Sequence, residues 1–148
     1  MPMPMSTDFK VYAVCSSVLA LQMLLLGAMT AATRARHKGY MNPEDARVSF
    51  GGAQLLASEH PDTARVIRAH RNMLETLPLF YALGLVYLVA GAPKLGLIVC
   101  SLAFTGARVL HSIVYLKGLQ PWRTILFGVS LLALVGMVVM ILLTVARA

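Results

Sequence analysis

The stretch WRTILFGVSLLALVGMVVMILLTV, residues 122–145, decides the fold, because its only charged side chain is Arg123 in the first turn. An α-helix rises about 1.5 Å per residue, so about 20 apolar residues cross the roughly 30 Å hydrocarbon core of a bilayer. The stretch has this length and this composition. It therefore predicts a transmembrane helix.

Three further apolar runs precede it, and the sequence predicts helices at about 9–33, 63–90, 95–116 and 122–145. The chain is 58% hydrophobic and 13% charged, with a mean hydropathy of +0.73, which is too apolar for an ordinary soluble domain. Backbone groups cannot stay unpaired in lipid, so we expect an all-α integral membrane protein, a four-transmembrane-helix bundle. No repeat or linker divides residues 1–148, which we expect to form a single domain.

The net charge of +7 comes from thirteen Lys and Arg against six Asp and Glu. Its distribution indicates membrane orientation, and we expect no nucleic-acid partner. Positive-inside counting places the basic connections in the cytoplasm and both termini outside it. On the other side lie only Lys10, Lys94 and Arg147. The basic connections carry Arg34, Arg36, Lys38, Arg47, Arg65, Arg68, Arg71, Lys117 and Arg123.

The connection from Arg34 to Asp62 is rich in turn-forming residues, which predicts an ordered cytoplasmic loop. Asp62 or Thr63 can cap the helix that follows. At about 40 Å, that helix is longer than the hydrocarbon core is thick, so its first turns extend into the interface.

Polar residues gather on these first turns. Arg68, Asn72 and Glu75 follow i, i+4 and i+7, and Arg71 precedes Glu75 by four, so all four lie near one stripe. A basic collar that snorkels to the interface explains the arginines but not the deeper Asn72 and Glu75.

The third predicted helix carries Arg108, His111 and Tyr115 at i, i+3 and i+7, with Arg108 near mid-membrane. An ionisable group at that depth indicates a functional site or a buried pair. Glu75 is the only carboxylate near an apolar segment, so we predict that it pairs with Arg108, and a purely structural ion pair is one alternative.

The fourth helix begins beside Pro121, and there we predict unpaired backbone amides next to Arg123 and Thr124. Such a place favours an anion, and a thiolate is the anion that most needs help near neutral pH. An arginine that merely orients the helix is the alternative. Together these residues predict a basic pocket on the cytosolic side, open to lipid. We expect no metal, because His111 has no second ligand at a suitable spacing.

Several of these segments resemble the MAPEG family of membrane proteins in eicosanoid and glutathione metabolism. They are Asn42-Pro43-Glu44-Asp45, RAHRNMLET at 68–76, ARVLHSIVYL at 107–116 and Arg123-Thr124, within residues 34–127. The resemblance implies a homotrimer of four-helix subunits, with glutathione as cofactor in clefts between subunits near the cytosolic side.

The resemblance also assigns residues to roles. Arg123, Thr124 and Asp45 match positions linked to thiol activation. Two departures stand out: Thr124 replaces a serine of the prostaglandin synthase branch, and Phe127 replaces a tyrosine. The positions that match the glutathione site are Arg34, Arg68, Arg71, Asn72, Glu75, His111, Tyr115, Arg123 and Thr124.

The function that this resemblance implies is a detoxifying membrane glutathione transferase, which conjugates glutathione to lipophilic electrophiles and also reduces lipid hydroperoxides. Two alternatives stay open: a glutathione-dependent prostaglandin E synthase, which isomerises an endoperoxide, and a non-enzymatic lipid-binding member. The expected membrane is a bacterial inner membrane or the endoplasmic reticulum, with the active site facing the cytoplasm.

Overall fold

The computed structural model describes residues 5–48 and 52–148. Within these residues, four helices are long and apolar enough to cross a membrane. The prediction of a four-helix membrane bundle is confirmed. The predicted bounds differ most at the first helix, which continues past 33 because nothing breaks it before Lys38 turns left-handed at φ 50°. The four helices are α1 (Thr7–His37), α3 (Pro61–Val89), α4 (Lys94–Lys117) and α5 (Trp122–Val145).

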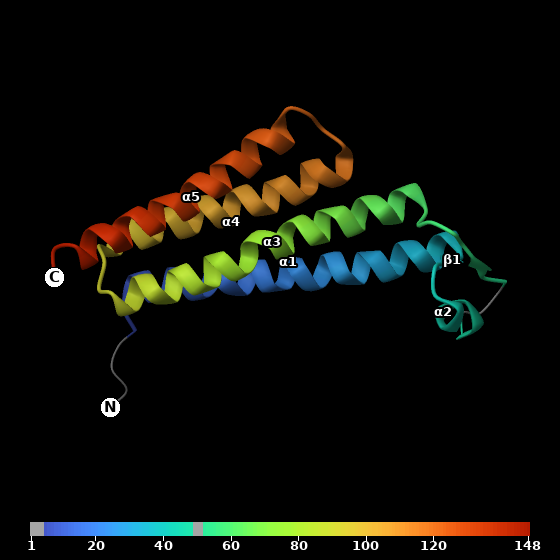
Figure 1. The fold of residues 1–148 in the computed structure, drawn as a ribbon, viewed down its shortest axis with the longest axis horizontal. Helices are drawn as coiled ribbons and strands as arrows, with labels where there is room; N and C mark the ends of the chain where they lie inside the picture. Colours follow the sequence, from blue (N-terminus) through green and yellow to red (C-terminus); the bar gives the residue numbers. More distant parts are fainter. Residues whose placement is uncertain (1–4, 49–51) are drawn as a thin grey trace.

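The helices pack as two antiparallel pairs, α1 with α3 and α4 with α5, and α1 also contacts α4 (Figure 1). The start of α1 and the end of α5 lie at one end of the bundle (Figure 1). The opposite end holds the end of α1, the start of α3 and the turn between α4 and α5 (Figure 1). Most of the polar residues singled out in the sequence are therefore gathered at one end.

The long connection between α1 and α3 is more regular than the loop predicted from its turn formers. It contains the short helix α2 (Pro43–Val48) and two parallel two-residue strands, β1 (Gly39–Tyr40) and β2 (Gln54–Leu55). The amide of Gln54 donates to the Lys38 carbonyl at 2.8 Å, and the amide of Leu56 donates to the Tyr40 carbonyl at 2.7 Å. These bonds tie the connection to the end of α1.

The predicted cap of the helix at 63–90 is wrong by a few residues. α3 begins at Pro61, which is favoured in the first turn, and His60 is the N-cap residue. His60 Nδ1 accepts a hydrogen bond from the Asp62 amide at 3.3 Å, so an imidazole fills the place expected for Asp62 or Thr63.

The centre of the bundle is an aromatic and aliphatic core, while the outer surface is apolar. Phe80 of α3 stacks on Phe104 of α4 with ring centroids 4.6 Å apart. Tyr12 of α1 donates from its hydroxyl to the Tyr81 carbonyl at 2.8 Å, which links α1 to α3. Large side chains such as Leu132 are exposed, as expected for helices that face lipid.

Candidate functional site

A cleft of about 260 Å³ opens between α3, α4 and α5 at the end of the bundle where α5 begins. Five of its six lining residues were predicted for the site from the sequence. α3 contributes one polar side chain, α4 contributes two on successive turns, and the first turns of α5 contribute the rest. The lining residues are Asn72, His111, Tyr115, Arg123, Thr124 and Phe127.

Arg123 is held at the mouth of this cleft by two neighbours. Its guanidinium carbon lies 4.9 Å from the centre of the Tyr115 ring, a cation–π contact. With its side-chain oxygen turned towards Arg123, Gln120 accepts from Nε at 3.0 Å and from Nη2 at 2.8 Å. The Gln120 nitrogen then lies 3.2 Å from the Thr124 hydroxyl. Gln120 was not predicted as a site residue, although its place three residues before Arg123 was visible.

The base of the cleft is formed around Arg108, which is fully buried. Its Nη1 donates to Asn72 Oδ1 at 3.1 Å and its Nη2 donates to the Asn72 carbonyl at 2.7 Å. Its guanidinium carbon is 5.9 Å from the ring centre of Phe127, which lines the cleft. A buried positive charge therefore lies directly behind the polar wall.

The predicted direct ion pair between Glu75 and Arg108 is not found among the described residues, although Glu75 is close enough for its charge to act on Arg108. The Glu75 carboxylate lies 3.7 Å from Arg71 Nε, its i+4 partner, and both side chains are largely exposed. Asn72 takes the place beside Arg108 because it is on the inner side of α3. The four residues predicted to share one face of α3 therefore lie on two faces. Asn72 faces α4, whereas Arg68, Arg71 and Glu75 are exposed.

At the start of α5, the backbone amides of Arg123 and Thr124 are themselves paired. The Arg123 amide donates to the Leu119 carbonyl at 3.3 Å, and the Thr124 amide donates to the Pro121 carbonyl at 3.0 Å. The turn before α5 already satisfies both groups. Arg123 and Thr124 can therefore offer an anion their side chains but not their backbone amides.

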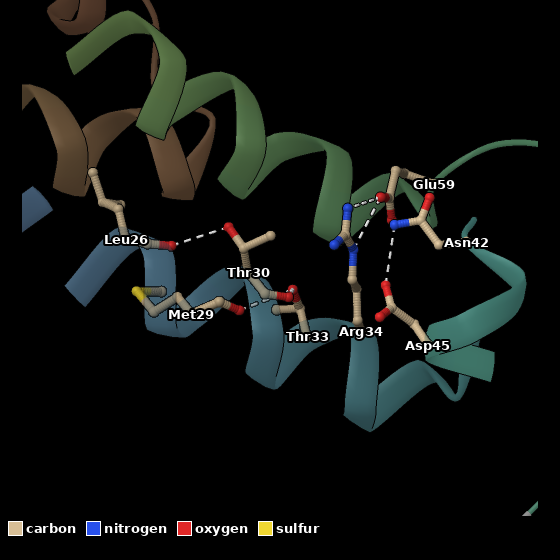
Figure 2. Close-up of polar contacts among 8 residues, drawn as sticks. All are labelled: Leu26, Met29, Thr30, Thr33, Arg34, Asn42, Asp45 and Glu59. Carbon is tan, nitrogen blue, oxygen red and sulfur yellow. Dashed lines mark hydrogen bonds and ion pairs between the residues drawn. The ribbon is translucent and has the colours of Figure 1, made fainter. Parts of the chain in front are cut away.

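Arg34 and Asp45, also predicted for the site, belong to a second polar cluster at the end of α1 (Figure 2). Arg34 Nε donates to Glu59 Oε1 at 3.0 Å, and its Nη2 contacts the same oxygen. Asn42 donates to Asp45 Oδ2 at 3.2 Å in α2. The partner of Arg34, Glu59, was not predicted. It lies 25 residues later in a connection, where helical periodicity gives no information about contacts with α1.

Another cluster joins α1 to α3. The rings of His37 and His60 stack with centroids 3.6 Å apart and planes 15° apart, and His37 Nε2 lies 3.3 Å from Asp62 Oδ2. An imidazole nitrogen from each of His37 and His60 and a carboxylate oxygen of Asp62 are close enough together to hold a metal ion. A metal ion lies near the plane of each imidazole that binds it, however, and near-parallel planes do not meet at one ion. We interpret this cluster as a joint between the two helices.

The MAPEG family model matches residues 12–143 of the chain, which includes both polar clusters. Prostaglandin E synthase of Macaca fascicularis is 36% identical over 143 residues, covering 96% of this chain and 93% of the relative. The Homo sapiens prostaglandin E synthase has the same identity and coverage. Microsomal glutathione S-transferase 1 of Homo sapiens is 35% identical over 126 residues, covering 82% of this chain and 81% of the relative.

Proposed function

Since the chain belongs to the MAPEG family, we propose that it is a membrane glutathione transferase, which conjugates glutathione to lipophilic electrophiles. The observation that carries the proposal is the cleft in which Arg123 and Thr124 face His111, Tyr115 and Asn72. The same site would reduce lipid hydroperoxides when a second glutathione completes the disulfide.

The electrostatics of the cleft support an anionic guest. Arg123 is at its mouth and Arg108 is behind it, and within the described residues the Arg108 guanidinium donates hydrogen bonds only to Asn72, which is neutral. The carboxylate whose charge acts on Arg108, Glu75, is largely exposed, so a bound anion would stabilise the buried guanidinium further. Glutathione carries two carboxylates and, once activated, a thiolate.

The chemistry follows from where the sulfur would lie. The thiol loses its proton to water, and the Arg123 guanidinium together with the Thr124 hydroxyl stabilises the thiolate. The sulfur then attacks the electrophilic carbon of a substrate that enters from the membrane. A carbon–sulfur bond forms while the leaving group departs with its electron pair.

The division of the predicted site between two clusters supports a trimer. The cleft of one subunit supplies Asn72, His111, Tyr115, Arg123 and Thr124. Arg34 and Asp45 lie apart, at the end of α1 and in α2. We propose that they face the cleft of a neighbouring copy, at the cytoplasmic side, where Arg34 holds a glutathione carboxylate and Asp45 assists the thiol. The exposed Arg68, Arg71 and Glu75 would then line the junction between copies.

The relatives named prostaglandin E synthase favour a second candidate, the isomerisation of a prostaglandin endoperoxide by the same bound thiol. Phe127 is the feature against it. Its ring lines the cleft 6.0 Å from that of His111 and offers no hydroxyl, where the resemblance expects a tyrosine. The non-enzymatic lipid-binding alternative is disfavoured by the retained Arg123 and Thr124.

The test measures conjugation of glutathione to an aryl chloride by the detergent-solubilised protein, with an endoperoxide as parallel substrate. Arg123→Ala should lower the rate about 10²- to 10³-fold, as loss of a group that stabilises developing charge does, while glutathione still binds. Lys117→Ala removes an exposed cation from the end of α4 and should leave the rate unchanged. Full activity in Arg123→Ala would refute the assigned role, and turnover of the endoperoxide alone would establish the second candidate.

A further inference from the structure

An apolar groove lies between α1 and α4, on a different face of α4 from the glutathione cleft. Its volume is about 380 Å³. The cleft uses His111 and Tyr115, whereas the groove uses Ser112 and Leu116, one residue further along and about 100° around the helix. From α1 it is lined by Val18, Leu21, Gln22, Leu25, Leu26 and Met29.

The groove continues into a basic cavity of about 220 Å³ at the end of the bundle where α3 begins. Met29 and Leu116 line both spaces, so the two meet there. The walls of the cavity carry Arg36 and His37 from α1 and Arg65 and Asp62 from α3. Two arginines and one carboxylate line the cavity, and His37 Nε2 lies 3.3 Å from the Asp62 carboxylate, so the cavity is basic overall.

Both arginines can bind an anion there. Arg36 is exposed and has no ion-pair partner among the described residues. Arg65 donates from Nη1 to the Leu116 carbonyl at 3.3 Å, which uses one of its five N–H donors. Planar guanidinium groups match phosphate oxygens, and the apolar groove begins immediately below them.

The length of the groove fits one leaflet. From Val18 to Met29 the helix rises about 16 Å, close to half of the roughly 30 Å hydrocarbon core. Its two polar side chains are partly satisfied by each other, since Gln22 donates to the Ser112 hydroxyl at 2.6 Å. The lining therefore suits a hydrocarbon chain below a charged head.

We propose that the groove and the cavity form a binding site for one anionic phospholipid. Its phosphate lies between Arg36 and Arg65, and one acyl chain runs between α1 and α4. The inference is independent of the proposed function, since the groove and the cavity contain no residue assigned to glutathione.

The test titrates delipidated protein in a nonionic detergent with phosphatidylglycerol or with phosphatidylcholine of the same acyl chains, and measures bound lipid by native mass spectrometry. Phosphatidylglycerol should bind at least about fivefold more tightly, the effect of one interfacial charge. Arg36→Gln should remove this preference, whereas Arg47→Gln, an exposed arginine in α2, should keep it. Equal binding of both lipids, or equal losses in both variants, would overturn the proposal.

A second pair of variants tests the groove. Met29→Trp fills the junction of the two spaces and should lower binding of both lipids, while Leu24→Trp, which is 70% exposed on the same helix, should not. If Met29→Trp instead dissociates the oligomer and leaves lipid binding intact, a second copy of the chain covers the groove and the proposal fails. Because Arg36→Gln changes only an exposed side chain, the head-group test stands even if Met29→Trp does not fold.

Discussion

The two polar clusters at one end of the bundle differ in how their charges are balanced. Behind the cleft, Arg108 is fully buried and its guanidinium donates to the neutral Asn72. At the end of α1, Arg34 is about 29% exposed and already pairs with the Glu59 carboxylate. A buried cation whose hydrogen-bond partner is neutral is expensive to maintain, whereas the partly buried Arg34 is already paired with a carboxylate. Under the proposed function, this difference fits an anionic ligand in the cleft, whereas Arg34 has its carboxylate partner without a ligand.

Breaking the contact behind the cleft should have the largest effect on stability. Asn72→Ala removes the side-chain acceptor of Arg108 and leaves a buried charged donor without it, so we expect a loss of about 3 kcal/mol. Thermal unfolding in detergent measures this loss. Asn42→Ala is the matched control, because it removes an exposed asparagine from the second cluster and should change the midpoint little. Equal shifts would contradict the proposed contrast.

A smaller effect should follow from the hydroxyl at the mouth of the cleft. Thr124→Ala removes a donor to the thiolate and should lower conjugation about tenfold, as one hydrogen bond of about 1.5 kcal/mol predicts. Thr124→Ser keeps the hydroxyl and should retain most of the rate. If both variants lose the same activity, the methyl group rather than the hydroxyl matters, and a purely steric role would replace thiolate stabilisation.

The second cluster can be tested by separating Arg34 from its partner. If Arg34 holds glutathione in a neighbouring copy, Arg34→Ala should weaken glutathione binding by roughly fivefold, as one exposed charge pair of about 1 kcal/mol predicts. Glu59→Gln breaks the same intrachain pair but keeps the guanidinium, so binding should stay unchanged or improve. Calorimetric titration distinguishes the two variants. Equal weakening in both would mean that Arg34 only fastens the connection to α1.

The sequence was sufficient to predict the features that depend on hydrophobic composition and on helical periodicity. Four spans follow from apolar runs, and the helical spacing of His111 and Tyr115 placed both side chains in one cleft. The sequence was not sufficient to predict contacts between residues of different segments, because helical periodicity relates only residues of the same helix. The partner of Arg34 lies in a connection, and the choice of Asn72 rather than Glu75 for Arg108 depends on the rotation of α3 against α4. The satisfied amides at the start of α5 depend on the conformation of the turn before it.

The smallest expected effect concerns Glu75, and it separates the two interpretations of α3. Had Glu75 neutralised Arg108, its replacement by glutamine would leave a buried charge and cost several kcal/mol. Because its carboxylate lies 3.7 Å from Arg71 Nε and its side chain is 58% exposed, we expect Glu75→Gln to cost about 0.3–0.5 kcal/mol, the value of an i,i+4 helix pair. Chemical or thermal unfolding of Glu75→Gln beside Asn72→Ala decides the matter. A loss as large as that of Asn72→Ala would mean that Glu75 turns inward in the assembled protein, and the cleft would then contain its own counterion before glutathione arrives.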